Sequence, residues 1–352
     1  MKKIKKISII FIVFILFICS SLFWAEKYLF NQALGNKDVV ESSDSPVSQK
    51  ILNPLTGLEL PSQKYDVRPI AVMINNSKTA QPLIGVHASD LIYEVSVEGG
   101  ITRLMALYQD PWEVESIGSV RSARDYYINL ANGHDAIYAH IGGSPQADEM
   151  MEDGKIDHFN ISSYYGAMWR DEFRMKNLGY EHSAFTSGRK IIDLITVNNV
   201  RYKIDRKKIP FQKFDEDSQV VEEGSPAYHM KVEFSNYKPT IFDYDEGSRG
   251  YLVSQFGTKQ MDGKYNRQVQ RGNVLVLKTE ISTINSKGLK EIKLENGEGL
   301  YMSRGKVMDI KWSKESEGAP FKYETKNGGN LVMVPGKTYI CIVSKSDNIS
   351  IN

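Results

Sequence analysis

The sequence predicts an α+β protein with an N-terminal membrane anchor, a mixed α/β first domain and a mostly-β second domain built as a sandwich or barrel. Three observations lead to this fold class: a charge-free apolar run near the start of the chain, strand and helix patterns that alternate over 53–200, and an almost unbroken series of strand and turn patterns over 228–348. The composition, 41% hydrophobic and 25% charged, is typical of globular proteins, and 352 residues suffice for about two domains.

Residues 1–26 predict a membrane anchor or signal segment. Four lysines precede residues 7–25, a run of 19 residues without a charge. As a helix this run is about long enough to cross a bilayer core of ~30 Å, and the lysines predict a cytoplasmic N-terminus, a cell-membrane location and an extracellular body. Two alternatives stay open: a lipoprotein cut before Cys19 and acylated there, or a signal peptide cut elsewhere, for example after Ser21. All three place the body outside the cytoplasm.

Charge and cysteine content narrow the class of protein further. Residues 1–26 hold four lysines and one glutamate, a charge of +3, so the net charge of +1 leaves −2 for the rest of the chain. A near-neutral body argues against a nucleic-acid partner. Residues 27–52 are polar and predict a tether between membrane and body. The two cysteines are Cys19 and Cys341, so the body has one thiol and no internal disulfide, and we expect this thiol to be buried and inert.

The first domain, 53–200, combines short strands with helices. Its first helix is expected at 123–131, with Ser122 as N-cap and Asp125 three residues later in a capping-box-like pair. A second helix should begin at Ser144, because a proline follows it, and a third covers 188–197. The strands are expected in four apolar runs rich in β-forming residues, at 69–74, 90–95, 101–108 and 136–141.

The second domain, 228–348, follows a charged connector at 201–227. Its strand patterns are separated by recurring turn signals rich in glycine, asparagine and aspartate. These turns are expected at 245–250, 261–264, 295–299, 303–306 and 326–329. Short strands at this spacing are typical of a small sandwich or barrel.

Arginines stand out between residues 98 and 174. Arg121 and Arg124 lie next to the expected helix start, where the helix dipole favours anions rather than cations. Together with Arg103 and Arg170 they could bind a phosphate or carboxylate, helped by free N–H groups at the helix end. The alternative is that these arginines form surface ion pairs or buried structural pairs.

The segment HIGGSP at 140–145 predicts a strand, a glycine turn and a helix start. Gly142 and Gly143 allow close backbone approach, and the helix start at Ser144 favours an anion. A plain capped turn explains the same residues. Ser144 as a nucleophile with His140 as base is a further reading, but the segment is not a GxSxG elbow.

Other polar and aromatic residues have both a functional and a structural interpretation. Glu94 and Glu98 are expected to flank Arg103 on neighbouring strand segments, where they could act as a general acid/base pair or simply pair with the arginines. Asp125 is a further candidate for general acid or base. Trp169 could stack on a sugar ring or pack in the core. No HExxH motif and no cysteine–histidine cluster occurs, so we expect neither a metal nor a cofactor.

A series of segments over about residues 53–345 stands out when it is taken in order. The segments are NPLTG (53–57), RPIAVMINN (68–76), ASDLIYE (88–94), EGGITR (98–103), IGSVRSAR (117–124), HIGGSP (140–145), WRD (169–171), RGNVLV (271–276), GEG (297–299) and PGKTY (335–339). Together they resemble the YerB-like proteins of Gram-positive bacteria, which are exported proteins of two paired domains of unknown function. The resemblance implies a surface location and a two-domain layout, and supplies no established reaction.

The chain departs from the family pattern at two places. Where the family has Pro-His-Asn, this chain keeps His182, a ligand-binding candidate, between a glutamate and a serine. In the second domain the family has an arginine two residues after a tyrosine and a histidine before an aspartate, and here Val253 and Gln260 stand in those places.

These observations favour a membrane-anchored extracytoplasmic protein of the cell envelope. It would bind an anionic cell-wall polymer, or an envelope protein, through an arginine-rich cleft in the first domain. The alternative is an envelope enzyme that acts on a phosphodiester or pyrophosphate-linked wall precursor, and a third possibility is a scaffold with flat protein contacts. Whether the protein is an enzyme stays open.

Overall fold

The computed structural model describes residues 52–60, 66–205 and 212–352. The anchor at 1–26, nearly all of the tether and residues 206–211 of the connector lie outside the described residues. Along the described ranges, no helix combines the length and the apolar character that crossing a membrane requires. The described residues all belong to one compact unit.

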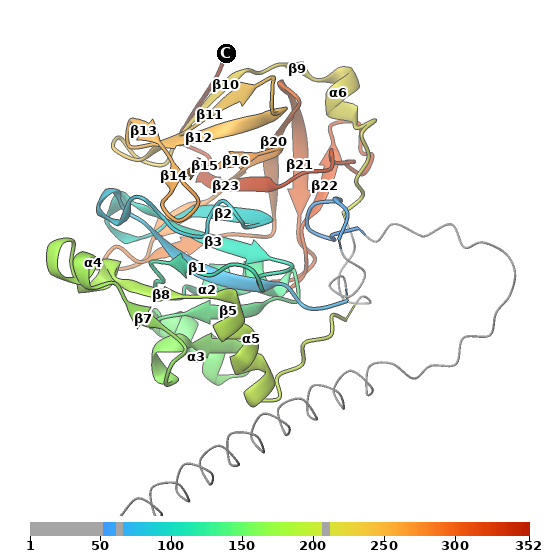
Figure 1. Cartoon of the computed structure of the whole chain (residues 1–352). Coiled ribbons are helices and arrows are strands. Elements are labelled where there is room, and N and C mark those ends of the chain that lie inside the picture. Colours follow the sequence, from blue (N-terminus) through green and yellow to red (C-terminus); the bar gives the residue numbers. More distant parts are fainter. Residues whose placement is uncertain (1–51, 61–65, 206–211) are drawn as a thin grey trace, which may run out of the picture. The chain divides into compact units, whose positions relative to one another are not determined.

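A mixed sheet of 11 strands is the centre of this unit (Figure 1). Both predicted domains contribute to it, so the core of the first half continues into the second. Ten strands lie in the order β22 (Lys322–Thr325), β21 (Lys306–Ser313), β20 (Asn296–Ser303), β17 (Asn273–Thr279), β23 (Thr338–Ser344), β2 (Leu91–Ser96), β3 (Thr102–Tyr108), β1 (Ile70–Asn76), β5 (Ile137–His140) and β6 (His158–Asn160), while β9 (Ser225–Pro226) pairs with β21.

The two halves of the chain meet where β2 pairs in parallel with β23, from Leu91 opposite Thr338 to Val95 opposite Ile342. Segments 247 residues apart in the sequence therefore lie side by side, as Figure 1 shows. A continuous ladder joins the halves through backbone hydrogen bonds, in addition to side-chain packing. The boundaries 53–200 and 228–348 stay predictions.

The four strands expected in the first domain are confirmed as β1, β2, β3 and β5. The helix expected at 188–197 is confirmed as α5 (Gly188–Val197). The helix expected at 123–131 is α2 (Asp125–Asn132), whose N-cap is Arg124 without a side-chain cap bond. The expected capping by Ser122 is therefore wrong. The chain before α2 stays extended because Arg121 N–H bonds Met73 O and Ala123 N–H bonds Gly142 O.

The remaining helices are short and connect strands. They are α3 (Pro145–Glu152), α4 (Glu172–Asn177), α6 (Gln219–Glu223) and the 3₁₀ turns η1 (Lys78–Ala80), η2 (Glu98–Gly100), η3 (Ile161–Ser163) and η4 (Tyr180–His182).

A second sheet of six strands packs against the central one. Its strands are β13 (Thr258–Lys259), β12 (Gly250–Gln255), β11 (Pro239–Asp245), β10 (His229–Glu233), β24 (Asn348–Ile351) and β16 (Gln270–Arg271). Smaller ladders join β14 (Met261–Asp262) with β15 (Arg267–Gln268), β18 (Ile281–Thr283) with β19 (Lys290–Ile292), and β4 (Ile117–Gly118) with β8 (Ala184–Thr186) and β7 (Trp169–Arg170). The second half thus has two facing layers, as in a sandwich, but one layer belongs to the sheet it shares with the first half.

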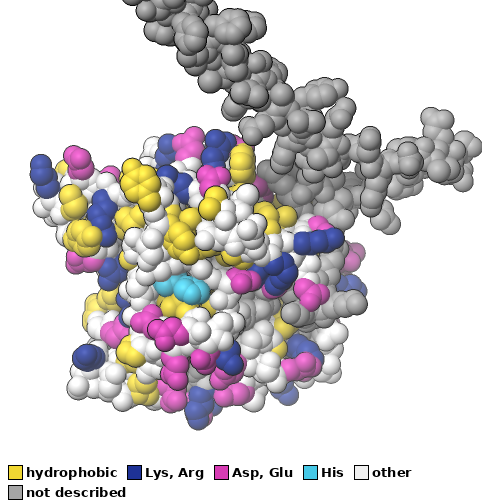
Figure 2. Space-filling view, turned by 90° about the horizontal axis from the view of Figure 1, so that it is seen from below, with side chains coloured by type: hydrophobic (Ala, Val, Ile, Leu, Met, Phe, Trp, Pro, Cys, Tyr) yellow, Lys and Arg dark blue, Asp and Glu magenta, His cyan; other side chains and the backbone are white. Residues whose placement is uncertain are grey.

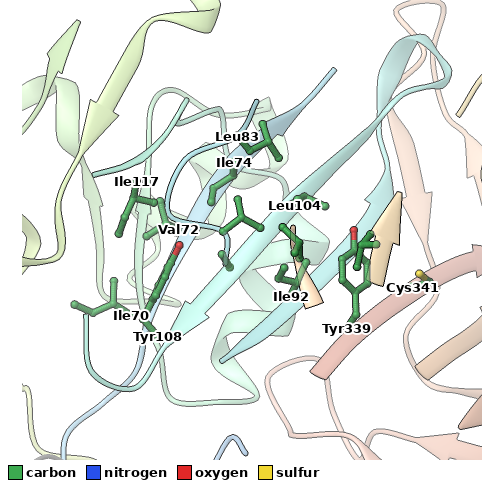
Figure 3. Close-up of a cluster of buried hydrophobic side chains, with 14 of the residues drawn as sticks. Ile70, Val72, Ile74, Leu83, Ile92, Leu104, Tyr108, Ile117, Tyr339 and Cys341 are labelled. Carbon is green, nitrogen blue, oxygen red and sulfur yellow. The ribbon is translucent and has the colours of Figure 1, made fainter. Parts of the chain in front are cut away.

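Two hydrophobic cores lie on the two faces of the central sheet. Since side chains alternate along a strand, Ile92 and Leu104 face one core and Tyr93 and Met105 face the other. The first core is shared with the second sheet and with α5, and Figure 3 shows part of it, including Cys341. The second core is covered by α2 and α3. The buried thiol expected at Cys341 is confirmed, and burial raises its pKa well above the usual value.

The turn expected at 295–299 is wrong, because these residues run into strand β20. A Cβ on Gly297 would lie 2.4 Å from Lys278 O and 2.7 Å from Trp312. The glycines therefore serve close approach between β17, β20 and the Trp312 ring rather than a reversal of the chain.

Candidate functional site

Three arginines and a glutamate lie together at the start of α2. Arg103 on β3 donates from Nη1 to Ser122 O at 2.7 Å. Arg124 donates to both carboxylate oxygens of Glu98, from Nε at 2.8 Å and from Nη2 at 2.7 Å. Arg121 donates to Glu181 O at 3.1 Å. We call Arg103, Arg121, Arg124 and Glu98 the arginine cluster.

The arginine cluster carries more positive than negative charge, with three guanidinium groups and one carboxylate. Arg103 is 6% exposed, and within the described residues its guanidinium makes a single hydrogen bond. Burial, followed by the charges of Arg124 and Arg121, lowers the pKa of Arg103 to about 10. A buried cation with unused N–H donors and like-charged neighbours is stabilised by an anion.

Glu98 is held ionised within this cluster. Burial alone would raise its pKa, but the hydrogen bonds and charge of Arg124 outweigh burial, and the pKa of Glu98 is lowered from 4.5. The pKa of Arg124 is raised, because the bonds to Glu98 outweigh its own burial. This pair is a structural ion pair, as the second interpretation of the arginines expected.

The fourth predicted arginine, Arg170, lies in a neighbouring cavity. Its Nη1 donates to Tyr180 O at 2.8 Å and to Ser183 Oγ at 3.0 Å, and its guanidinium lies 3.4 Å from the centre of the Tyr180 ring. The cavity has a volume of about 190 Å³ and also contains Arg121. Arg121 and Arg170 thus face one hollow, whereas Arg103 and Arg124 are not part of its lining. Its wall consists of Val120, Arg121, Ser122, Ile141, Arg170, Tyr180, Glu181 and Ala184.

His182 and Trp169 flank this region. His182 is buried, its Nδ1 accepts from Asn75 Nδ2 at 2.9 Å, and burial is the main cause of its lowered pKa. Trp169 is 37% exposed and stacks on Phe185 with ring centres 6.3 Å apart. His182 is therefore held by a hydrogen bond from Asn75, and Trp169 is only partly covered.

His140 supports the glycine turn instead of facing the cavity. Its Nδ1 lies 2.8 Å from Gly142 O, and its Nε2 lies 2.9 Å from His158 Nδ1. A carbonyl only accepts, so His140 carries its proton on Nδ1 and accepts from His158 at Nε2. Burial lowers the pKa of His140 to about 4, so it is neutral. His140 itself is 1% exposed, and the view from below in Figure 2 shows histidine atoms at the surface between hydrophobic and acidic side chains.

The helix start after this turn is confirmed. Ser144 is the N-cap of α3, its Oγ accepts from Ala147 N at 3.3 Å, and proline follows it. Gly142 has a φ of +67°, and a Cβ on Gly143 would lie 2.1 Å from Asp148 Oδ1. Ser144 Oγ is thus used for capping, and no hydrogen bond to His140 activates it among the described contacts.

Glu94 lies on the opposite face of the sheet from Arg103. In the β2–β3 ladder Glu94 is opposite Leu104 and Val95 is opposite Arg103, so the two charged side chains point to different faces. The expectation that Glu94 and Glu98 flank Arg103 as a pair is therefore wrong. Asp125 is the first residue of α2, and burial raises its pKa.

Glu94 is fully buried and forms the centre of a polar network. Its ion-pair partner is Lys238, which donates from Nζ to Oε1 at 2.7 Å. We call Glu94, Lys238 and the five further donors given in the next sentence the Glu94 network. The other donors to Glu94 are Asn76 Nδ2 at 3.0 Å, Thr102 Oγ1 at 2.6 Å, Thr240 Oγ1 at 2.8 Å, Tyr339 OH at 2.8 Å and Gln255 Nε2 at 3.5 Å.

Sequence reasoning proposed no role for any member of the Glu94 network except Glu94, although Asn76, Thr102 and Tyr339 lie in segments that carry the family resemblance. Lys238 and Thr240 are on or beside β11, and Tyr339 is on β23, far from Glu94 in the sequence. Lys238 follows two polar residues and an aromatic one, a pattern that resembles an exposed turn. No local signal marks it as buried.

The second departure from the family pattern includes Gln260, which stands where that pattern has a histidine. Its polar side chain is left unsatisfied. Gln260 is 2% exposed, and neither its Oε1 nor its Nε2 has a hydrogen-bond partner among the described residues. Nearby Asp262 is buried and accepts from the backbone N–H groups of His87 and Lys264. Across the described ranges, no group of three or more His, Cys, Asp or Glu is placed to hold a metal ion.

Comparisons with known proteins agree with the motif order. Models described as the N-terminal and C-terminal domains of "Protein of unknown function (DUF3048)" match residues 55–201 and 230–340. "Putative lipoprotein YerB" of Bacillus subtilis (strain 168) is 31% identical over 310 residues, 87% of this chain and 90% of that protein. The crystal structure of YerB protein from Bacillus subtilis has a TM-score of 0.76 and 30% identity, and the match covers 86% of this chain and all of that one. The chain therefore belongs to the YerB-like family of paired DUF3048 domains.

Proposed function

We propose that this protein is a membrane-attached, extracytoplasmic protein of the cell envelope that binds an anionic envelope ligand at the arginine cluster. Two facts support the location: the apolar run at 7–25 behind four lysines, and a similar protein whose name describes a lipoprotein. The ligand carries phosphate or carboxylate groups, because these match the bidentate geometry of guanidinium.

The observation that carries this proposal is that Arg121 and Arg170 line one cavity and, among the described residues, donate only to carbonyl and hydroxyl oxygens. The buried cation Arg103 beside Arg121 adds positive charge. Arg124 is already neutralised by Glu98, so Arg103 and Arg121 supply the unmatched charge. Arg121 also faces the cavity that contains Arg170 and the exposed Tyr180. An anionic group in this cavity would meet Arg121 first and leave the ion pair of Arg124 intact.

The test is co-sedimentation of the full chain, extracted in detergent, with purified cell walls that keep or lack their anionic polymers. We expect binding that requires the polymers and weakens at high salt. Arg121→Ala should reduce the affinity on the order of tenfold, as expected for loss of a hydrogen bond to a charged group.

The matched control is Arg267→Ala, which removes an exposed arginine from β15 in the second half. It should bind as the wild type does. Equal loss in both variants would mean that general positive charge, and not the arginine cluster, attracts the wall. Absence of wall binding by folded wild-type protein would reject an anionic wall ligand.

A further inference from the structure

A lysine amine, a carboxamide and a carboxylate meet in the core between the two halves. Lys238 Nζ donates to Glu94 Oε1 at 2.7 Å, and Asn76 Nδ2 donates to the same oxygen at 3.0 Å. The two nitrogens therefore lie no further apart than the sum of these distances. Asn76, Glu94 and Lys238 all have side chains closed off from solvent.

The carboxamide of Asn76 is bonded on one side only. Its Nδ2 donates to Glu94 Oε1 and to Thr102 Oγ1, while its Oδ1 is buried without a hydrogen-bond partner among the described residues. A buried amide oxygen without a donor is costly. A rotation of the Asn76 side chain that brings its carbonyl carbon toward the amine therefore breaks no hydrogen bond of the carbonyl oxygen.

The surroundings of the amine are aromatic. Lys238 Nζ lies 5.1 Å from the centre of the Phe256 ring and 5.7 Å from that of Phe234, with Thr240 Oγ1 as its second hydrogen-bond acceptor at 2.9 Å. Two charges without water are expensive in such a site. Transfer of one proton along the bond from Nζ to Glu94 leaves a neutral amine and a neutral acid, and a neutral, desolvated lysine amine is a nucleophile.

We propose that Lys238 and Asn76 form an intramolecular isopeptide bond, with Glu94 as the group that moves the protons. The neutral Nζ attacks Cγ of Asn76, and a new Nζ–Cγ bond forms. Glu94 returns its proton to Nδ2 and takes the second proton from Nζ as the Cγ–Nδ2 bond breaks. One ammonia leaves and nothing is oxidised or reduced, so no co-reactant is needed.

The bond would join the two halves covalently. Asn76 ends β1 in the first half, and Lys238 lies beside β11 in the second. The chain beyond residue 26 contains one cysteine, so a disulfide within it cannot provide such a link. Proximity in a preorganised core is the physical basis for a reaction that does not occur between free side chains in water.

The test is mass spectrometry of the full chain, purified in folded form and then denatured. The wild type should be lighter by one ammonia than its sequence requires, after allowance for N-terminal processing. A protease digest should contain the peptide with residue 76 joined to the peptide with residue 238. Separate, unmodified peptides from folded wild-type protein would overturn the proposal, and this digest decides even where a variant fails to fold.

Two variants locate the chemistry. Lys238→Arg keeps a cation for Glu94 but lacks the amine, and should show the full mass and separate peptides. Glu94→Gln keeps the shape but cannot accept the proton, and should leave most chains unjoined. N-terminal processing is the same in all three proteins, so differences between them report the bond alone. A joined product that persists in Glu94→Gln would remove Glu94 from the mechanism.

Discussion

The arginine cluster and the Glu94 network lie on opposite faces of the same two strands and differ in how their charges are met. Thr102 and Arg103 are neighbours on β3, yet Thr102 donates to Glu94 and Arg103 reaches the start of α2. In the Glu94 network one carboxyl group meets one lysine amine and several neutral donors, so no charge is left unmatched. The arginine cluster sets three cations against one carboxylate.

This difference separates a structural role from a binding role. A buried carboxyl group whose oxygens already accept hydrogen bonds from buried donors has no free acceptor site for a ligand. Removing one of these donors costs stability. A buried guanidinium with unused donors gains free energy when an anion arrives. Residues one position apart in the sequence can therefore serve different purposes, and each purpose can be tested separately.

The largest effect is expected from Lys238→Ala, which removes the buried partner of Glu94 and with it the proposed covalent link between the halves. The free energy of unfolding should fall by about 3–5 kcal/mol, measured by urea denaturation. Lys231→Ala is the control, because Lys231 pairs with Glu233 at the surface of the same sheet, and its effect should be far smaller. An equal loss of stability in the two variants would show that the buried contact of Lys238 with Glu94 contributes no more than a surface ion pair.

A smaller loss is expected from Arg124→Ala. Glu98 loses two hydrogen bonds from a charged donor, and the free energy of unfolding should fall by about 1.5–3 kcal/mol. Arg124→Lys should fall between the wild type and alanine, because it keeps the charge and loses the two-bond geometry. If Arg124→Ala left the free energy of unfolding unchanged, the pair would contribute nothing to folding.

The same pair predicts a dependence of stability on pH. The pKa of Glu98 in the folded protein is below its usual 4.5, so this stabilisation is complete above pH 4.5 and is lost as the pH falls through the lowered pKa. Urea denaturation of wild type and Glu98→Gln at a series of acidic pH values checks this. The difference in stability between the two proteins should shrink as the pH falls below 4.5, and a constant difference contradicts the prediction.

The smallest effect on stability is expected from Arg121→Ala. Arg121 is partly exposed and makes one hydrogen bond, to Glu181 O, so the loss should stay below about 1 kcal/mol. Pyrophosphate should raise the thermal midpoint of the wild type more than that of Arg121→Ala, because a ligand stabilises the state that binds it. An equal rise in both would place the anion elsewhere.

Most elements of the first half could be predicted from the sequence because their signals are local. Strands β1, β2, β3 and β5 follow from apolar runs of β-forming residues, and the start of α3 follows from Ser144 and the proline after it. The start of α2 was misplaced, because Arg121 and Ala123 use their N–H groups in bonds to Met73 and Gly142. Those partners are far away in the sequence, so no local pattern reveals them.

The candidate site was predictable only in part. The arginines were identified as a group, and the structure brings Arg103, Arg121 and Arg124 together while it pairs Arg124 with Glu98. Placing Glu94 beside Arg103 failed, since a strand alternates its side chains but the sequence does not say which register and face each residue takes.

The sequence by itself determined the mixed α/β composition, the positions of most first-half strands, the helix at Gly188–Val197 and the family to which the chain belongs. Only the tertiary structure decided that β2 pairs with β23, and that Lys238 meets Glu94 in the core. The physical reason is range: turns, caps and periodicity act over a few residues, whereas strand partners and buried ion pairs are chosen by the packing of segments far apart in the chain.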